Sequence, residues 1–491
     1  MAINISVAFV LTLAYVIALH PFSDVSHIIL TDETASLKQG LTGNFSYANF
    51  ESSPMYSHLY QFLGLFVDNA QSLYLLNHAV LFFSFLFLLA LVLMVYTKKP
   101  VLVFIITGLF LYLPGYQIWP RVNFLTCIVL LLFLFAIYPI KQFSIKVALA
   151  IVVSYLLVFV RPEFFLSFYV FYFMGVTMLL HSAYLYYKDK PLFAGSTHLF
   201  ASLAVVTTLM LFFVTPSVSD SDRSFEAFSQ HYSFAIHLAE GLKTNPWHAH
   251  LIIRERDFPG ADSVVSALMV NPEAFIQHVT KNVLIGFLFV LGVFGFIYLY
   301  MAVANKKLLP EQWNVESIFL LVFMLPIAIG VALVYPREHY LLVMFVLLAL
   351  LPSLLFSKRH LSLKRVGISL SIVLLITVML PPKKVFLDKG IENQLAVIGD
   401  VEREFTLGRV LGAEDGWCIY LDTCHSNVKA ENDATADWIK DNIDTIFITN
   451  GLLKSTEDKE IELIIQQPEL YGFTEKKINA DLSLLLKNDK S

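Results

Sequence analysis

The sequence predicts a polytopic α-helical membrane protein with about eleven transmembrane helices, which ends in a small extracytoplasmic α/β domain. Three observations predict this class. The chain is 57% hydrophobic, and its mean hydropathy is +0.67. Charged residues make up 15% of it, against about 25% in ordinary soluble domains. Apolar runs close to the roughly 20 residues that cross a bilayer follow one another through the first part of the chain.

Short polar connectors separate the expected spans. The spans fall at 3–20, 74–96, 101–118, 122–140, 145–160, 164–187, 192–215, 283–304, 317–335, 340–356 and 366–381. The first apolar run lacks the basic leading residues and the small-residue cleavage site of a signal peptide, which favours a retained span.

Basic residues divide the connectors into two alternating sets. One set carries Lys98, Lys99, Lys141, Lys146, Lys188, Lys190, Lys306, Lys307, Lys358, Arg359, Lys364 and Arg365. The positive-inside rule assigns this set to the cytoplasm. The larger segments 21–73 and 216–282 and the tail then face outward. The chain is therefore expected to consist of a transmembrane domain, residues 1–382, and a soluble extracytoplasmic domain, residues 383–491.

The tail has the pattern of a mixed α/β domain. Its apolar runs lie at 409–411 and 418–421, a helix-like stretch at 434–442 and a buried strand at 445–449. Cys418 and Cys424 are close together in an oxidising compartment, which favours a structural disulfide, with two buried thiols as the alternative. Cys127 lies in an apolar run and is expected in the core.

Asp32 and Glu33 are the candidate catalytic residues of the first outer loop. Adjacent residues diverge by about 100° on a helix, so one can face a substrate while the other binds a backbone amide, a metal or an arginine. A carboxylate in a partly dry cavity has a raised pKa and can accept a proton from an attacking hydroxyl. We favour Asp32 as this base, with Glu33 as the alternate. Capping of a helix over 35–40 by Thr31 or Asp32 is the structural alternative.

An aromatic-rich amphipathic segment ends the same loop. Pro54 suits the first turn of a helix that lies on the membrane surface. Glu51, Tyr56 and His58 are candidate substrate-binding residues, and interface anchoring is the alternative for Tyr56. His58 with Asp32 or Glu51 would offer ligands to a divalent metal, but their spacing defines no metal site.

Three short external turns carry an arginine beside a proline, namely Arg121, Arg161 and Arg337. The proline ends a helix, and a charge at the edge of the hydrocarbon has a cost that a ligand can offset. Guanidinium groups bind phosphate bidentately, so these arginines are candidates to hold the phosphate of a lipid-linked donor, with Arg337 preferred. Snorkelling to head groups or pairing with Glu163 or Glu338 is the alternative.

The second outer loop is expected to cover the cavity and to shape the acceptor site. Trp247 is a candidate for stacking on a sugar ring, with packing against the tail as the alternative. His248 and His250 share one side only on a strand, so this pair does not favour a zinc site.

The order of these parts resembles the GT-C superfamily of glycosyltransferases, and most closely the bacterial relatives of the protein O-mannosyltransferases and of the lipid A aminoarabinose transferase. The resemblance covers most of the chain by architecture. Its motifs are Thr31-Asp32-Glu33-Thr34, Ser53-Pro54-Met55-Tyr56, Asn271-Pro272-Glu273-Ala274-Phe275 and Pro336-Arg337-Glu338-His339-Tyr340. One departure concerns the donor, because Ser52-Ser53-Pro54 replaces the Lys-Pro-Pro motif of many relatives.

The resemblance implies a bacterial inner-membrane enzyme with its outer loops and tail in the periplasm. Its donor would be a polyprenyl-phosphate-linked sugar, with Asp32 as general base and Arg337 on the donor phosphate. His339 would be a neighbouring substrate-binding residue. The acceptor would be a hydroxyl of a glycan, lipid or protein, and transfer would invert the anomeric centre.

Two other classes stay open. An O-antigen polymerase or ligase also has many spans and outward arginines, although its catalytic loop usually lies late in the chain. A transporter or flippase would place ionisable groups deep in its spans, where this chain has only His78, His181 and His198. The net charge of −5 over this length says little about partners, but the chain has no basic block and no nucleic-acid-reading motif, so we expect no nucleic-acid partner and expect the lipid bilayer as a partner.

Overall fold

The structure is a computed structural model that describes part of the chain. The described residues are 2–19, 36–37, 53–67, 70–97, 103, 106–107, 122–188, 205, 208, 221–242, 249–290, 314–334, 336, 338–355, 401, 404–405, 408–412, 436–449, 459–478 and 482–488. Asp32, Glu33, Glu51 and most of the connectors lie outside these ranges.

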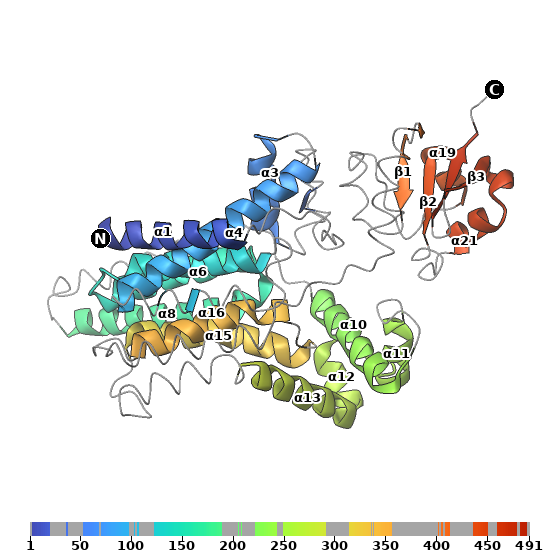
Figure 1. Cartoon of the computed structure of the whole chain (residues 1–491). Helices are drawn as coiled ribbons and strands as arrows, with labels where there is room; N and C mark the ends of the chain where they lie inside the picture. The colour runs from blue at the N-terminus through green and yellow to red at the C-terminus, as the bar shows by residue number, and fades with distance from the viewer. Residues whose placement is uncertain are drawn as a thin grey trace.

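The membrane part is a bundle of apolar helices (Figure 1). The helices are α1 (Ala2–Leu19), α4 (Ala70–Thr97), α6 (Val122–Ile137), α7 (Phe143–Val158), α8 (Phe165–Tyr187), α15 (Val315–Leu333) and α16 (Glu338–Leu355). Three segments, Ser72–Thr97, Pro162–His181 and Val315–Leu333, are long and apolar enough to cross a membrane. The chain is therefore a mostly helical membrane protein.

The expected spans agree with the described helices where the two overlap. Shorter apolar helices occupy Asn4–Leu13, Val122–Ile137, Phe143–Val158 and Leu341–Leu351. The expected spans 101–118, 192–215 and 366–381 fall almost wholly outside the described residues. The total of eleven spans therefore stays a prediction.

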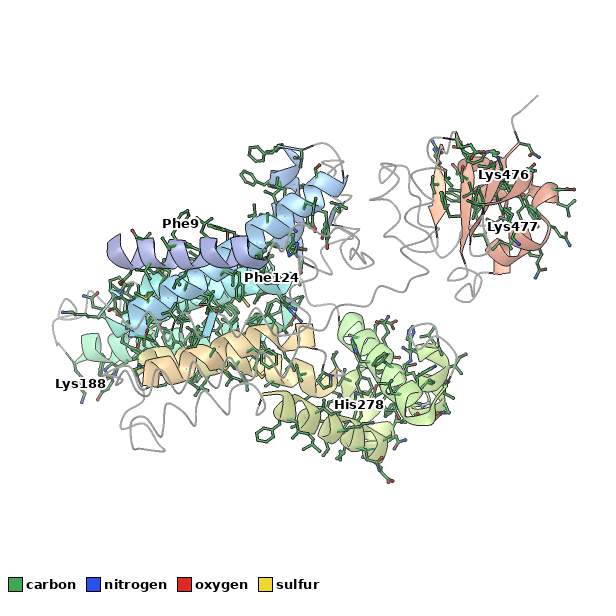
Figure 2. All side chains as sticks on the ribbon, viewed as in Figure 1. Phe9, Phe124, Lys188, His278, Lys476 and Lys477 are labelled. Carbon is green, nitrogen blue, oxygen red and sulfur yellow. The ribbon has the colours of Figure 1, made fainter. Side chains whose placement is uncertain are left out.

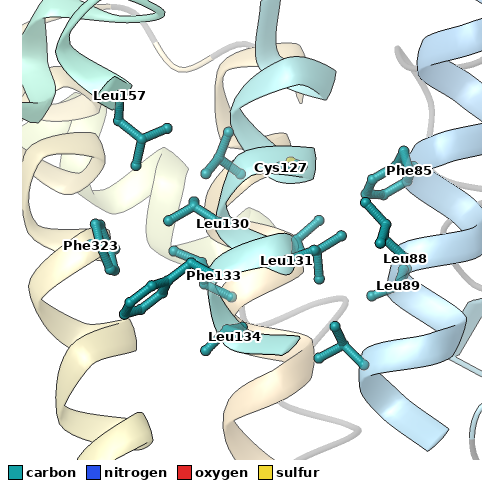
Figure 3. Packing of buried hydrophobic residues seen from close by; sticks show 14 of the residues in the cluster. Phe85, Leu88, Leu89, Cys127, Leu130, Leu131, Phe133, Leu134, Leu157 and Phe323 are labelled. Atoms are coloured by element: carbon teal, nitrogen blue, oxygen red, sulfur yellow. The ribbon is translucent and has the colours of Figure 1, made fainter. Parts of the chain in front are cut away.

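Apolar side chains fill the interior of the bundle, as Figure 3 shows for part of it. Phe133 of α6 packs between α6 and α15, with its ring centroid 6.1 Å from that of Phe319 and 5.5 Å from that of Phe323. Phe85 of α4 packs edge-on against Phe124 of α6 at 5.4 Å. Such edge-on aromatic pairs add about 0.5–1.5 kcal/mol to the burial of their area.

A buried ion pair joins α7 to α15 where these two helices begin. The Lys146 ammonium donates a hydrogen bond to Glu316 Oε1, and the two side chains are only 10% and 13% exposed. Phe143, at the start of α7, also lies against Phe319 of α15. Lys146, which the charge pattern assigns to the cytoplasmic set, is thus neutralised by Glu316.

Helix α13 (Pro272–Val290) begins well before the expected span at 283. Its start has two local causes. Asn271 Oδ1 accepts a hydrogen bond from the backbone N–H of Ala274 at 3.2 Å, and proline is favoured at a first helical position. The start of α13 could not be located from the apolar run alone, because the first two turns of the helix carry polar residues and precede that run.

Four helices outside the bundle core form a helical subdomain, composed of α10 (Ser221–Glu240), α11 (His250–Asp257), α12 (Val264–Val270) and the first turns of α13 (Figure 1). Phe228 is fully buried at its centre. The Phe228 ring lies 5.6 Å from that of Phe258 and 5.3 Å from that of Phe275. The second outer loop is therefore largely helical where the structure describes it.

The tail combines helices with a small sheet, in agreement with the predicted α/β pattern, and the expected run 418–421 lies outside the described residues. Its strands are β1 (Val410–Gly412), β2 (Thr445–Thr449), β3 (Phe473–Lys477) and β4 (Leu482–Lys487), in the order β1-β2-β4-β3. Strands β1 and β2 are parallel, and the other pairs are antiparallel. Helices α19 (Ala436–Asn442) and α21 (Lys459–Gln466) bury Ile439 and Ile464 in the same cluster as Ile446 and Leu485 of the sheet. Strand β3 is an edge strand whose last four side chains are all exposed.

Candidate active site

The end of the first outer loop is bonded to the turn that carries Arg161. Two hydrogen bonds make this contact. Ser53 Oγ donates to the carbonyl of Val160, and the backbone N–H of Met55 donates to the carbonyl of Phe159 at 3.0 Å. Residues about a hundred positions apart in the sequence therefore meet here. We call this contact and the polar side chains around it the outer junction.

Prolines shape both partners of the outer junction. Helix α3 (Pro54–Gly64) has Pro54 in its first turn, as predicted. The short 3-10 helix η2 (Pro162–Phe164) begins in the same way, after Arg161 in an extended conformation. A residue before proline is disfavoured in the helical region, so Arg161 ends one helix and leads into the next. The direction of the Arg161 side chain is therefore set by the extended backbone of the turn and not by a helix.

The Arg161 guanidinium is partly exposed and has two protein partners. It donates a hydrogen bond to Oδ1 of the buried Asn123 and pairs with Glu163 Oε1 at 2.5 Å. A guanidinium has five N–H donors, so within the described part of the chain three of them have no protein acceptor. The expected pairing with Glu163 is present, and Arg161 retains donors for a further anion.

Helix α3 turns Tyr56 inward and His58 outward. Tyr56 is buried and accepts a hydrogen bond from Asn77 Nδ2 of α4 at 3.0 Å. His58 is exposed and lies 2.9 Å from Gln61 Oε1 through its Nδ1. Residues two apart on a helix point in nearly opposite directions, so these two predicted substrate-binding residues do not share one site. Tyr56 positions α3, and His58 faces away from the junction.

The described residues nearest to the predicted carboxylates also contact α3. Ser36 Oγ lies 3.1 Å from Ser57 Oγ, and both hydroxyls are buried. Leu37 is fully buried beside them. The loop that carries Asp32 and Glu33 is thus anchored to α3 three residues after Glu33.

Two other predicted arginines flank helix ends that lie at the same end of the bundle. From the contact of Phe133 with Phe319 and Phe323, α6 runs back to Val122 and α15 runs on to Leu333. At 1.5 Å per residue, the stretch from Phe133 to Val122 rises about 16–17 Å and the stretch from Phe323 to Leu333 about 15 Å. Val122 follows Arg121, and Leu333 precedes Arg337 by four positions.

The remaining predicted site residues lie outside the described residues. They are Asp32, Glu33, Glu51, Arg121, Trp247, Arg337, Cys418 and Cys424. His339 is the second residue of α16, and its side chain also lies outside the described part. Within the described ranges, no three or more His, Cys, Asp or Glu side chains gather in a way that would hold a metal ion.

A second polar cluster joins the helical subdomain to the bundle. His278 Nε2 of α13 lies 3.1 Å from the carbonyl of Leu333, and Asn282 Nδ2 donates to the carbonyl of Ala332 at 3.2 Å. Both carbonyls belong to the last turn of α15, which has no intrahelical donors for them. Two side chains of α13 therefore cap the helix that leads to Pro336 and Arg337 (His278 is labelled in Figure 2).

A hydrogen-bonded cluster around Asp257 links α11 to α10 within the helical subdomain. Asp257 binds the Arg256 guanidinium at 2.7 and 2.8 Å, and it accepts a hydrogen bond from the Tyr232 hydroxyl at 2.9 Å. Partial burial opposes ionisation of Asp257, but the bonds from Arg256 and Tyr232 and the charge of Arg256 outweigh it and lower the pKa of Asp257. Burial, together with the bond to Asp257, raises the pKa of the Tyr232 hydroxyl above its usual value. These residues act as a structural network.

The contact of His278 with α15 is expected to weaken in mild acid. His278 lies outside the expected spans, and burial, aided by the charge of Lys281, lowers its pKa to about 4 although its bond to Leu333 raises it. When the contact between α13 and α15 opens, the pKa of His278 returns to its usual value near 6.5, so the opened state binds the proton more readily. The contribution of this contact to stability is therefore complete above pH 6.5 and is lost as the pH falls toward 4. Between pH 7 and 5 the loss is about 2 kcal/mol. This loss is measured by hydrogen exchange of the backbone amides of α10–α13, after correction for the pH dependence of the intrinsic exchange rates.

The matched control for this experiment is His278→Gln, which keeps a hydrogen-bond donor but cannot titrate. We expect exchange in this variant to be nearly independent of pH over the same range. An unchanged pH dependence would assign the effect to other histidines of the subdomain.

Sequence reasoning missed Asn77, Asn123, His278 and Asn282. The sequence contains a signal for Asn77 and Asn123, because a side-chain amide inside an apolar span is costly to bury and usually has a hydrogen-bond partner. His278 and Asn282 stand at i and i+4, which places them on one face of a helix, but only the tertiary packing identifies Ala332 and Leu333 as their acceptors.

Comparison of this chain with protein-family models, with curated protein sequences and with solved structures found no significant match. The GT-C resemblance therefore rests on the motifs and their order along the chain.

Proposed function

We propose that this protein is an inverting glycosyltransferase that moves a sugar from a polyprenyl-phosphate carrier to a hydroxyl acceptor at the outer end of the bundle. One observation carries the proposal. The outer junction bonds Ser53 and Met55, which follow the predicted carboxylates in the first loop, to the turn of Arg161. This contact links the loop with the predicted base to the turn of an arginine that has donors without an acceptor among the described residues.

Covalent geometry supports a common site. Ser36 is buried against Ser57, and Asp32 precedes Ser36 by four residues. Four extended residues span at most about 14 Å. A carboxylate at Asp32 is thus restricted to the neighbourhood of α3, which is itself bonded to the Arg161 turn.

The proposed reaction balances with these residues. The Asp32 carboxylate takes the proton of the acceptor hydroxyl, and the oxygen forms a bond to the anomeric carbon. The bond from that carbon to the carrier phosphate breaks on the opposite face, which inverts the centre. The departing phosphate keeps the electron pair, and its charge is met by Arg337 with Arg161 or Arg121. The protonated Asp32 then returns its proton to water.

The Arg161 environment suits an oxyanion such as a phosphate. Glu163 already neutralises one edge of the guanidinium, and Asn123 fixes its orientation. A pre-oriented guanidinium loses less side-chain freedom when it binds a planar or tetrahedral anion. The remaining donors would meet phosphate oxygens at the edge of the hydrocarbon, where the head groups of a lipid carrier lie.

The test is sugar transfer by the purified full-length protein in phospholipid vesicles. A polyprenyl phosphate carrying one radiolabelled sugar is supplied with a soluble acceptor. We expect release of free polyprenyl phosphate together with a labelled glycoside of inverted configuration. Replacing Arg161 with alanine should lower kcat/KM by about 10²–10³-fold, and lysine should restore only part of it.

The other function classes give different products in the same vesicles. A polymerase or ligase would transfer a complete glycan and leave the single-sugar donor intact. A transporter or flippase would move the labelled donor between leaflets without cleaving it. Either result would replace the proposed function. Unchanged transfer by Arg161→Ala together with Arg337→Ala would leave the function in place and would show that other groups bind the departing phosphate.

A further inference from the structure

Helix α12 packs against protein on one side only. Ala267 is buried in the cluster around Phe228, and Val264 and Leu268 contact the same cluster. On the other side Val265 is 70% exposed and Met269 is 77% exposed. The helix has no charged residue. Single exposed apolar residues are ordinary, but a helix with apolar residues on every side is usually covered.

The exposed apolar surface continues onto α13. Val270, at the end of α12, is 44% exposed, and Ile276, in the second turn of α13, is 56% exposed. Val283 and Phe287 follow Ile276 at i+7 and i+11, so all three share one side of the helix, and all are exposed. One apolar surface therefore runs from the expected span outward to α12.

Polar residues of α13 border this surface, and Glu273, three residues before Ile276, stands only about 60° from it on the helix. Glu273 Oε1 accepts a hydrogen bond from Gln277 Nε2 at 3.1 Å, and both residues are exposed. On a helix Gln277 and Lys281 stand about 100–140° from Ile276, beside the apolar surface. This separation into a polar side and an apolar side is typical of helices that lie at a membrane–water boundary.

The contacts with α15 fix the depth of this region. Helix α15, at 19 residues, is about 28 Å long, close to the thickness of the hydrocarbon core of about 30 Å. Its last residue, Leu333, thus lies near one hydrocarbon edge. His278 contacts the Leu333 carbonyl, and Ile276 lies two residues away, about 3 Å along the helix. The head-group layer beyond the edge is roughly 5–8 Å deep.

We propose that α12 and the first two turns of α13 rest in the head-group layer of the leaflet at this end of the bundle. Val265, Met269, Val270 and Ile276 contact lipid. The bilayer is the occupant because the exposed apolar residues of α13 continue from Ile276 through Val283 to Phe287, into the expected span. The helical subdomain is thus seated on the membrane and not raised above it. This inference does not depend on the proposed enzymatic activity.

Spin-label accessibility tests this inference in the full-length protein. The native cysteines Cys127, Cys418 and Cys424 are replaced with alanine, and single cysteines are introduced as Met269→Cys and, as an aqueous control on the exposed strand β3 of the tail, Glu475→Cys. Phe287→Cys serves as the lipid control. In phosphatidylcholine–phosphatidylglycerol nanodiscs the collision rates of each label with oxygen and with a soluble nickel chelate are measured. We expect the oxygen-to-nickel ratio at Met269 to be several-fold higher than at Glu475 and to approach that at Phe287.

Two other outcomes would overturn the inference. A nickel-accessible label at Met269 would leave α12 in water. A label that is immobilised and reached by neither reagent would show that protein covers α12, either a second copy or another part of this chain. If the cysteine-free background does not fold, a benzophenone amino acid at Met269 in the otherwise native protein replaces the label. Cross-linking to phospholipid supports the inference, and cross-linking to protein or to nothing refutes it.

Discussion

Replacing Asp32 with asparagine is expected to lower the rate of sugar transfer by about 10²–10⁴-fold, which is the usual contribution of a general base. Asparagine keeps the size and the hydrogen-bonding oxygen of aspartate but cannot take a proton at neutral pH. The loss should appear mainly in kcat, because a base acts as the acceptor proton is transferred and not when the donor binds. Initial rates of transfer in vesicles, at saturating donor, measure the effect.

The matched control is Glu33→Gln, which removes the neighbouring charge and leaves Asp32 in place. We expect this variant to retain most of its activity. If Glu33→Gln is the inactive variant, the two carboxylates exchange roles. If both variants transfer sugar at the wild-type rate, the base lies elsewhere and Asp32 is a helix cap. Equal expression and equal thermal unfolding of the variants separate chemistry from folding.

Breaking the Lys146–Glu316 pair is expected to destabilise the bundle by about 3–5 kcal/mol. The pair is nearly inaccessible, and it joins helices that are 170 positions apart in the sequence. Lys146→Met leaves the Glu316 carboxylate buried without its counter-charge, and Glu316→Gln does the reverse. Both should lower the midpoint of thermal unfolding in detergent, followed by circular dichroism.

The double variant Lys146→Met/Glu316→Leu tests whether the loss of stability comes from leaving one charge buried without its partner. Two apolar side chains of similar volume need no counter-charge, so most of the lost stability should return. Additive losses in the double variant would mean that the two side chains act independently. A matched exposed pair is Lys476 with Glu404, whose removal should cost no more than about 1 kcal/mol.

The helices of the bundle could be predicted because length and apolarity alone decide whether a segment can cross a bilayer. The predicted span 122–140 and helix α6 illustrate this agreement. Boundaries set by single side chains were harder, as α13 shows, since Asn271 and Pro272 move its start outward. Strand β3 escaped prediction because its charged residues have no alternating pattern.

The candidate site was predictable in its residue types and not in its contacts. Proline beside Arg161 predicted a turn, and the structure has η2 there. No local rule relates Ser53 to Val160 or Tyr56 to Asn77, because packing of the whole bundle decides which helices are neighbours. His58 stands two residues after Tyr56 and is exposed where Tyr56 is buried, because residues two apart on a helix point in nearly opposite directions.

The charged edge strand β3 of the tail affects whether neighbouring copies of this protein can pair through their sheets. Free edges of a β-sheet can recruit a strand from another molecule, and lysine is a common means of preventing it. Glu475, Lys476 and Lys477 are all solvent-exposed along β3. To extend the sheet, neighbouring copies at high density in a membrane would have to take these charged side chains out of water, so their tails should remain separate.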